Sequence, residues 1–188
     1  VEETNTNKVG KFDYALAKKQ GSTGKNWISL PLISSITTAS GLTTAIGPSV
    51  DTISRWNAQL QQSEGWINVW GGVGTNFAIK RGEFYEIHIK NSTNWTLTGG
   101  VPTTEDDIEL KFAGGSGRNW IGLVIDTVLV RASDIFNSIG NAVTMIRRWD
   151  STAQTYNIFT PSAGSNFTVK PGEGYEVHVS SNVTWMPE

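Results

Sequence analysis

The sequence predicts a mostly β chain with one short helix per repeat, folded as two tandem homologous antiparallel modules of β-sandwich or barrel-like form. Three observations carry this prediction: the chain repeats itself, its apolar residues alternate with polar ones, and it has enough apolar material for a core. Hydrophobic residues make up 38% of the 188 residues and charged residues 17%. That balance is typical of a folded globular chain.

The internal repeat defines the modules. Asn-Trp-Ile-Ser-Leu at residues 26–30 matches Asn-Trp-Ile-Gly-Leu at residues 119–123, and 9 of the 20 positions in residues 76–95 are identical to their partners in residues 166–185. A repeat of this length is the signature of two copies of one structural unit. We therefore place the modules at residues 1–100 and 101–188. The linker falls in residues 99–107, where glycines, a proline and acidic residues interrupt the apolar pattern.

The strands follow from alternation with a period of two, which is clearest in residues 84–90. Tyr85 in this segment would face the core, whereas Glu86 and His88 would face solvent. Strands are predicted in the first module, with equivalents in the second, at residues 12–16, 27–32, 52–56, 66–69, 77–80 and 84–90.

One short helix is predicted in each module. Ser40 and Ser133 are good N-cap residues, and Gly47 and Gly140 stand where the chain must leave the helix. Residues 80–83 and their equivalents have the composition of tight turns between consecutive strands, which predicts an antiparallel hairpin at the end of each module.

Charge and composition exclude several classes of partner. Fifteen Lys and Arg against 17 Asp and Glu leave a net charge of −2, with no basic cluster for a phosphate backbone, so we expect no nucleic-acid partner. No apolar run is long enough to span a membrane, and residues 1–7 lack a signal-peptide pattern, so we expect no membrane insertion and any targeting segment outside this sequence.

Location is indicated by polar residue usage rather than by cysteine chemistry. The chain has no cysteine, which excludes disulfides, thiolate nucleophiles and Cys-based zinc sites. Abundant Ser, Thr, Asn and Gly indicate an extracellular or cell-surface location. Asn-X-Ser/Thr sequons stand at Asn91, Asn94, Asn166 and Asn182.

Two tryptophans occur in the first module alone. Trp66 and Trp70 align with a stretch around residues 158–160 that has no tryptophan, so they must serve something local. On a strand, positions 66, 68 and 70 share one face. Ile67 and Val69 would then point inward while both indoles point outward.

Outward indoles at this spacing suit stacking on the apolar faces of sugar rings. Asn68 and Gln62 lie close in sequence and can donate and accept hydrogen bonds. The predicted ligand-binding residues are therefore Trp66, Trp70, Asn68 and Gln62. The alternative is that Trp66 packs beneath the following glycine-rich loop.

Aromatic residues that both modules share are assigned to the core, because a position filled alike in both copies serves the shared fold. These pairs are Trp27/Trp120, Trp56/Trp149, Phe77/Phe167, Tyr85/Tyr175 and Trp95/Trp185.

No metal or cofactor is expected. Glu86 with His88, and Glu176 with His178, offer only two ligands per module, and nothing nominates a third, so a solvated strand face is the favoured interpretation. The acids at residues 105–107 lack the oxygen spacing of a calcium loop and are interpreted as a solvated linker.

No catalytic residue is predicted. The two histidines occupy equivalent positions on predicted outward faces, which leaves no Ser-His-Asp candidate, and no phosphate-binding glycine loop occurs. Paired carboxylates among Glu83, Glu86, Glu173 and Glu176 keep an enzyme active on glycans as a minor alternative.

At residues 26–32, 55–57 and 76–85 and at their partners, the chain resembles the tandem β-rich repeats of large secreted bacterial and archaeal cell-surface proteins. The resemblance covers nearly the whole chain and implies an accessory or surface-display role rather than a chemistry. The first module departs from the pattern where the pairs Arg81/Pro171 and Phe84/Gly174 differ.

Two hypotheses about function follow. The first is a non-catalytic extracellular module pair that attaches to polysaccharide or another surface component through Trp66 and Trp70, and it predicts a shallow aromatic patch. The second is a purely structural repeat that spaces or assembles neighbouring domains of the same polypeptide. It predicts that every tryptophan is buried.

Overall fold

The structure of the chain is a computed structural model that describes residues 8–102 and 106–187. Residues 103–105 of the predicted linker therefore lie outside the described part. The elements of the first module are β1 (Val9–Leu16), β2 (Lys25–Ser29), α1 (Ala39–Ile46), β3 (Val50–Asn57), β4 (Gln62–Ile67), β5 (Val73–Gly74), β6 (Phe84–Ile89) and β7 (Thr93–Gly100).

The second module repeats this order with shorter outer strands. Its elements are β8 (Ile108–Leu110), β9 (Arg118–Gly122), α2 (Ala132–Ile139), β10 (Val143–Asp150), β11 (Thr155–Thr160), β12 (Ala163–Gly164), β13 (Gly174–Val179) and β14 (Val183–Trp185).

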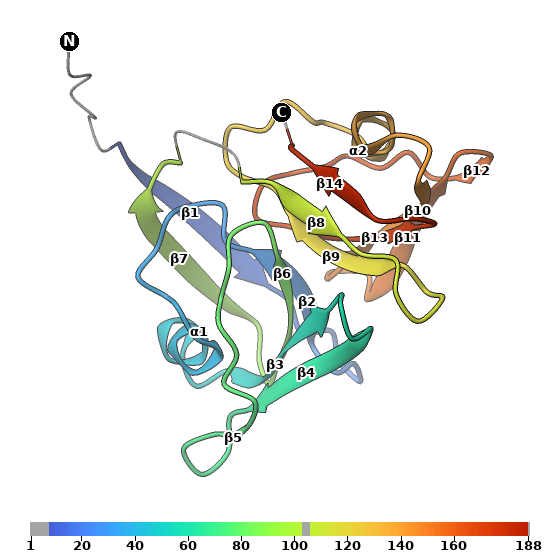
Figure 1. Ribbon diagram of the computed structural model, residues 1–188. Helices are drawn as coiled ribbons and strands as arrows, with labels where there is room; N and C mark the ends of the chain where they lie inside the picture. The colour runs from blue at the N-terminus through green and yellow to red at the C-terminus, as the bar shows by residue number, and fades with distance from the viewer. Residues whose placement is uncertain (1–7, 103–105, 188) are drawn as a thin grey trace.

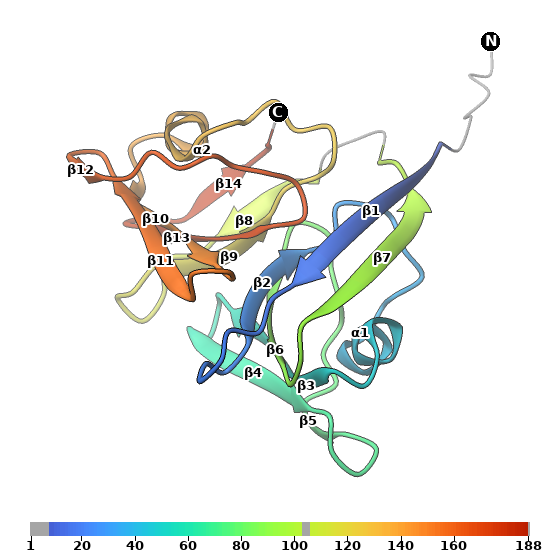
Figure 2. The same ribbon diagram turned by 180° about the vertical axis from the view of Figure 1, so that it is seen from behind.

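Each module contains one five-stranded and one two-stranded antiparallel sheet. The large sheets have the strand orders β2-β6-β3-β4-β5 and β9-β13-β10-β11-β12, and the small sheets are β1-β7 and β14-β8. Figures 1 and 2 show the two modules side by side, the first in blue and green and the second in yellow to red. The predicted fold class, mostly β with a short helix per repeat, is confirmed.

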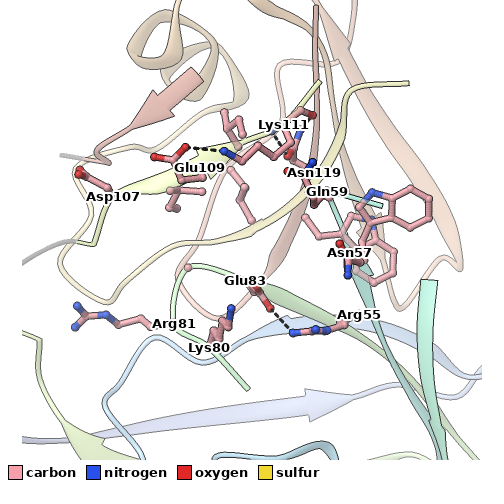
Figure 3. A pocket seen from close by; sticks show the side chains of 17 residues that line it. Arg55, Asn57, Gln59, Lys80, Arg81, Glu83, Asp107, Glu109, Lys111 and Asn119 are labelled. Carbon is pink, nitrogen blue, oxygen red and sulfur yellow. Dashed lines mark hydrogen bonds and ion pairs between the residues drawn. The ribbon is translucent and has the colours of Figure 1, made fainter. Parts of the chain in front are cut away.

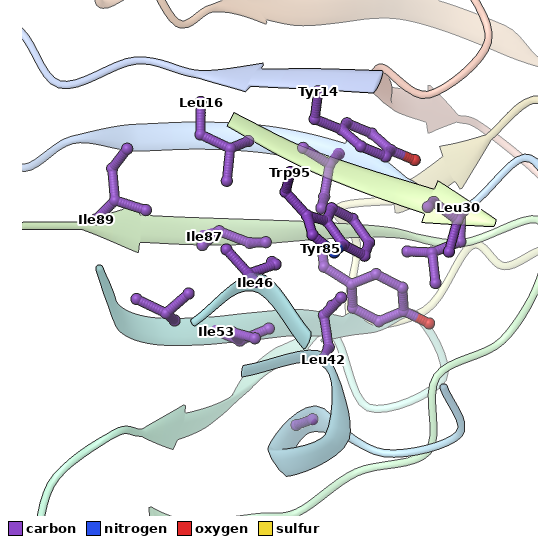
Figure 4. Packing of buried hydrophobic residues seen from close by; sticks show 14 of the residues in the cluster. Tyr14, Leu16, Leu30, Leu42, Ile46, Ile53, Tyr85, Ile87, Ile89 and Trp95 are labelled. Atoms are coloured by element: carbon purple, nitrogen blue, oxygen red, sulfur yellow. The ribbon is translucent and has the colours of Figure 1, made fainter. Parts of the chain in front are cut away.

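A separate apolar core fills each module. In the first, Ile53 and Ile87 from the large sheet, Tyr14 and Trp95 from the small sheet and Leu42 from α1 converge on one cluster (Figure 4). The rings of Tyr14 and Trp95 stack with centroids 4.8 Å apart, which joins the two strands of the small sheet. The small sheet and the helix thus cover one face of the large sheet, and the second module has a matching cluster.

The alternation predicted for residues 84–90 is present, because Tyr85 and Ile87 are fully buried. Residues 77–80, by contrast, form no strand. Phe77 O accepts from Ala39 N, and Ile79 N donates to Thr37 O, so this segment binds the chain that leads into α1. The predicted terminal hairpin is therefore wrong.

The helices lie where predicted, but their N-caps do not. Thr38 caps α1 by accepting a hydrogen bond from Gly41 N, and Arg131 occupies the N-cap of α2. Ser40 and Ser133 lie inside the first turns. Both helices end at the predicted glycines, which adopt positive φ angles of 105° at Gly47 and 93° at Gly140.

Candidate functional site

The loop that links β4 to β5 carries the most exposed aromatic side chain of the described residues. We call residues 68–72 the Trp70 loop. The Trp70 side chain is 99% exposed, and its backbone has a φ of 48°. Because β4 ends at Ile67, Trp66 and Trp70 do not share a strand face, which corrects the predicted arrangement.

Trp66 holds the loop from below instead of facing outward. It is half-buried and packs against the first module's core. A Cβ atom placed on Gly72 would lie 1.7 Å from the Trp66 ring, so the loop backbone rests directly on the indole. Ile67 and Val69 are 42% and 36% exposed, the reverse of the predicted orientation. Trp66 therefore packs beneath the glycine-rich loop, as the alternative interpretation required.

The two predicted polar residues do not join Trp70. The Asn68 side-chain amide donates to Val50 O at 2.9 Å, which anchors the base of the loop to β3. Gln62 begins β4 and pairs with Asn57, at the opposite end of that strand from the loop. Sequence proximity suggested a cluster, whereas the extended strand separates its members.

The Trp70 loop therefore offers one aromatic plane on an apolar tip. Ile67, Val69 and Val73 lie within three residues of Trp70 in the sequence, and the side chain of each is at least a third exposed. An indole presents a flat apolar face and one N–H donor, which suits contact with a ligand that is apolar on one face and polar at its edge.

The second candidate region is the junction between the modules, where contacts are reciprocal. Trp56 of the first module donates from Nε1 to Arg118 O at 2.8 Å, and Trp149 of the second donates to Lys25 O at the same distance. Trp56 aligns with Trp149, and Lys25 with Arg118. Each module thus presents the same face to the other, as in the isologous interface of a two-fold dimer.

An aromatic cluster lies at the centre of this junction. Trp27, Phe84 and Trp120 are buried together, and Trp56 and Trp149 pack against them. The Phe84 ring stacks on Trp120 with centroids 4.3 Å apart. Duplication marked four of these residues as core, but the sequence did not show that the core they share lies between the modules.

The strand face that carries Glu86 and Glu176, which was predicted to be solvated, is covered at the junction. Glu176 is fully buried and forms ion pairs with Arg118 and Arg147, and His178 Nε2 lies 2.6 Å from its carboxylate. Burial alone would raise the pKa of Glu176, but the hydrogen bond from His178 and the two guanidinium charges lower it to about 2. The pKa of Glu86 is lowered in a similar way.

The Glu86 carboxylate accepts hydrogen bonds from Trp27 Nε1 at 2.8 Å and pairs with Lys25 at 2.7 Å. Burial opposes its ionisation, yet the bonds from His88, Lys25 and Trp27 bring its pKa down to about 2. Both carboxylates therefore serve the junction. The prediction that they face solvent is wrong for Glu176, which is fully buried, whereas the Glu86 side chain keeps 18% of its surface exposed. No group of three or more His, Cys, Asp or Glu side chains suited to a metal occurs within residues 8–102 and 106–187.

Two equivalent cavities flank the junction. The first junction groove, with a volume of about 400 Å³, lies between the end of β3 and residues 80–83 on one side and β8 and β9 on the other (Figure 3). The second junction groove, of about 360 Å³, lies between β1, β2 and residues 170–173. The pseudo-two-fold relation between the modules maps each groove onto the other.

The first junction groove carries charges of both signs. Figure 3 shows Arg55 and Glu83 facing each other across its floor and Lys111 paired with Glu109 on the opposite wall. Burial raises the pKa of Glu83, and the nearby charge of Arg55 opposes that rise. A groove of balanced charge does not select a strongly charged ligand.

Comparison of the chain with protein-family models, with curated proteins and with solved structures finds no match in any of the three. Across the described residues, no helix is long and apolar enough to cross a membrane. The functional argument therefore rests on the geometry of the Trp70 loop and of the junction.

Proposed function

We propose that the chain is a non-catalytic extracellular attachment unit that binds polysaccharide at a cell surface, with the Trp70 loop as its contact. The observation that carries this proposal is the 99% exposure of Trp70 on a loop whose counterpart in the second module, residues 161–162, is shorter and has no tryptophan. A large indole held in water gains free energy when a partner covers it, and tryptophan is enriched among residues that dominate binding.

The construction of the loop supports the proposal. Trp66 beneath Gly72 and Asn68 bonded to Val50 O fix the loop backbone before any ligand arrives. A contact that is already ordered loses little conformational entropy on binding. Sugar rings present C–H faces that match an indole plane, and the open tip gives access to a chain lying along a surface.

A purely structural spacer is the second candidate, and the reciprocal junction favours it. Trp56 and Trp149 each bond to the other module, so the pair forms one rigid block suited to spacing its neighbours. The spacer hypothesis, however, also predicts that every tryptophan is buried, and the exposure of Trp70 speaks against it.

The test is affinity electrophoresis of the chain through gels that contain soluble polysaccharides. We expect at least one polysaccharide to retard the wild type, Trp70→Ala to lose about tenfold or more in affinity, and Trp70→Phe to retain part of it, because an aromatic plane remains. The matched control is Val128→Ala, which trims a 71% exposed apolar residue of the second module.

Retardation that survives in Trp70→Ala, or that Val128→Ala abolishes equally, would contradict the assignment to the loop. An absence of retardation across neutral and acidic polysaccharides would favour the spacer. Circular dichroism of each variant confirms that it is folded.

A further inference from the structure

The first junction groove runs between the edges of two strands. Five successive residues, 107–111, line one wall and three successive residues, 119–121, line another. Side chains alternate between the two faces of a strand, so a cavity bordered by successive residues is bordered by the strand edge itself. The edges of β8 and β9 therefore face this groove, and strand edges display backbone donors and acceptors.

The outer edge of β9 has an unpaired position at its centre. Val179 N bonds to Gly117 O, so the alternating antiparallel pattern turns the backbone groups of Arg118, Trp120 and Gly122 away from β13. The first module occupies the two ends of this edge. Trp56 and Gln61 bind the backbone of Arg118, and Gly122 N bonds to Gly82 O at 2.9 Å.

Trp120 lies between these two ends. Within residues 8–102 and 106–187 its backbone N–H and C=O form no hydrogen bond with a turn, a loop or a side chain, and no isolated β-bridge joins Trp120 to the first module. An unpaired edge position that borders a cavity can bind a peptide group from outside.

The edge of β8 presents a second unpaired position. Lys111 directs both of its backbone groups to the Asn119 side chain, with N–H donating at 2.7 Å and C=O accepting at 3.1 Å. Alternation along the strand places the backbone groups of Glu109 on the same edge. Ile108 and Leu110, the residues on either side, face β14.

The Asn119 side chain spans the gap between β8 and β9 and so indicates its width. A carboxamide has the same donor and acceptor as a peptide group, and this one reaches from β9 to bind both backbone groups of Lys111 on β8. One end of the gap is thus already bridged by a single amide. In the second junction groove, Asn26 bridges to Ala17 in the same way.

We propose that the first junction groove binds an extended peptide, which adds as a strand between β8 and β9 and bonds to Glu109 on one side and Trp120 on the other. Strand addition of this kind draws its affinity from backbone hydrogen bonds. A cavity of about 400 Å³ suits a short extended segment.

The proposal assigns the first groove rather than the second because of Phe12. The Phe12 ring lies against Gly172, so close that a Cβ on that glycine would meet it at 2.3 Å. In the first groove, Ile108 lies near Gly82 and leaves more room, because the corresponding distance is 3.3 Å. The rim carries both Lys80 and Glu83, so peptides of either charge can enter.

The experiment begins with selection of random heptapeptides displayed on phage against the full chain carrying Trp70→Ala, which removes the aromatic tip. Selected peptides are then synthesised and titrated by calorimetry. Glu109→Pro removes the one N–H of β8 that faces the groove, and proline is tolerated at such an edge position. We expect it to weaken peptide binding at least tenfold.

Two matched variants separate the backbone from the side chain and from stability. Glu109→Ala removes only the carboxylate and should leave affinity within about threefold of the parent. Ala15→Pro places the same change on the equivalent strand edge of the second groove and should leave binding unchanged. Hydrogen exchange adds an independent readout, since the amides of Glu109 and Trp120 should exchange rapidly in the free chain and become protected in the complex.

The proposal is overturned if no peptide is selected, if Glu109→Ala weakens binding as much as Glu109→Pro, or if Ala15→Pro does so. Protection of the Glu109 and Trp120 amides by neutral oligosaccharides instead of peptides would also overturn it. Because the selection uses Trp70→Ala, its failure is independent of the proposed attachment through the Trp70 loop.

Discussion

Glu176 is a fully buried carboxylate whose ionisation the junction requires. It neutralises Arg118 and Arg147, whereas its counterpart Glu86 pairs with Lys25 and retains some solvent contact. The difference arises because the second module has Arg147 where the first has Ser54. The second module therefore contains the more tightly coupled of two otherwise equivalent charge clusters.

We expect Glu176→Gln to lower the free energy of unfolding by about 3 to 5 kcal/mol at pH 7, because it leaves two partly buried guanidinium groups without a counter-charge. Glu86→Gln should cost less. The pKa of Glu176 is lower in the folded chain than its ordinary value of 4.5. Its contribution is therefore present in full above that value and is lost as pH falls toward 2.

Urea unfolding at a series of pH values measures both effects. The wild type should lose stability between about pH 5 and pH 2, and the Glu176→Gln variant should lose less over the same window. Equal pH dependence in the two proteins would show that Glu176 is not the group responsible.

Sequence reasoning at this scale placed the buried side of a strand correctly and misjudged the other side. Tyr85 and Ile87 point into the core as alternation predicts. Glu86 and Glu176 occupy the alternate positions on the opposite face of their strands. The alternating pattern is the same whether that polar face contacts water or another module, so the sequence pattern alone cannot distinguish the two. Duplicated charges beside duplicated tryptophans were the available signal that this face is covered.

At the scale of elements, the Trp70 loop depends on two glycines with different surroundings. Gly71 and Gly72 both have positive φ angles, 87° and 110°. A Cβ on Gly71 would meet nothing within 4 Å, whereas one on Gly72 would enter the Trp66 ring.

Gly71→Ala should therefore cost only backbone strain, about 1 kcal/mol. Gly72→Ala should cost about 2 to 4 kcal/mol, because overpacking adds to that strain and displaces Trp66. Thermal unfolding gives the order of the two variants, and near-UV circular dichroism reports the environment of Trp66. A Gly72→Ala chain as stable as Gly71→Ala would mean that Trp66 does not support the loop.

The elements that sequence reasoning missed are those defined by distant partners. β7, the last strand of the first module, pairs with β1, its first strand, so the two partners are far apart in the sequence. Residues 77–80 look like a strand in isolation, but their backbone groups bind the segment before α1. Local alternation identifies a strand, whereas its neighbour is set by how the complete module closes.

At the scale of the whole molecule, the reciprocal junction makes the two modules a closed pair. Each uses the same face toward the other, so neither retains that face for a further copy. Any additional repeat would have to attach through another surface. At this junction some residues lie directly against the equivalent residue of the other module. At such positions the difference in sequence between the two copies has a physical explanation.

Phe84 and its counterpart Gly174 are such a position. A Cβ on Gly174 would lie 2.4 Å from the Phe84 ring, and a Cβ on Gly122 would lie 2.3 Å from that of its own counterpart, Ser29. Near a two-fold axis only one of two equivalent side chains can fit. The mismatch between the copies that the sequence displays is therefore a requirement of the junction.

This explanation predicts that the two residues can exchange places. Phe84→Gly alone should cost about 3 to 5 kcal/mol, because it empties the centre of the aromatic cluster. Gly174→Phe alone should also destabilise the chain, because two rings would compete for one space. In the double variant one ring again fills the space, so its free energy of unfolding should lie well above that predicted by adding the two single effects. Denaturant unfolding of all four proteins measures this coupling energy, and strict additivity would mean that residues 84 and 174 do not share a site across a pseudo-two-fold axis.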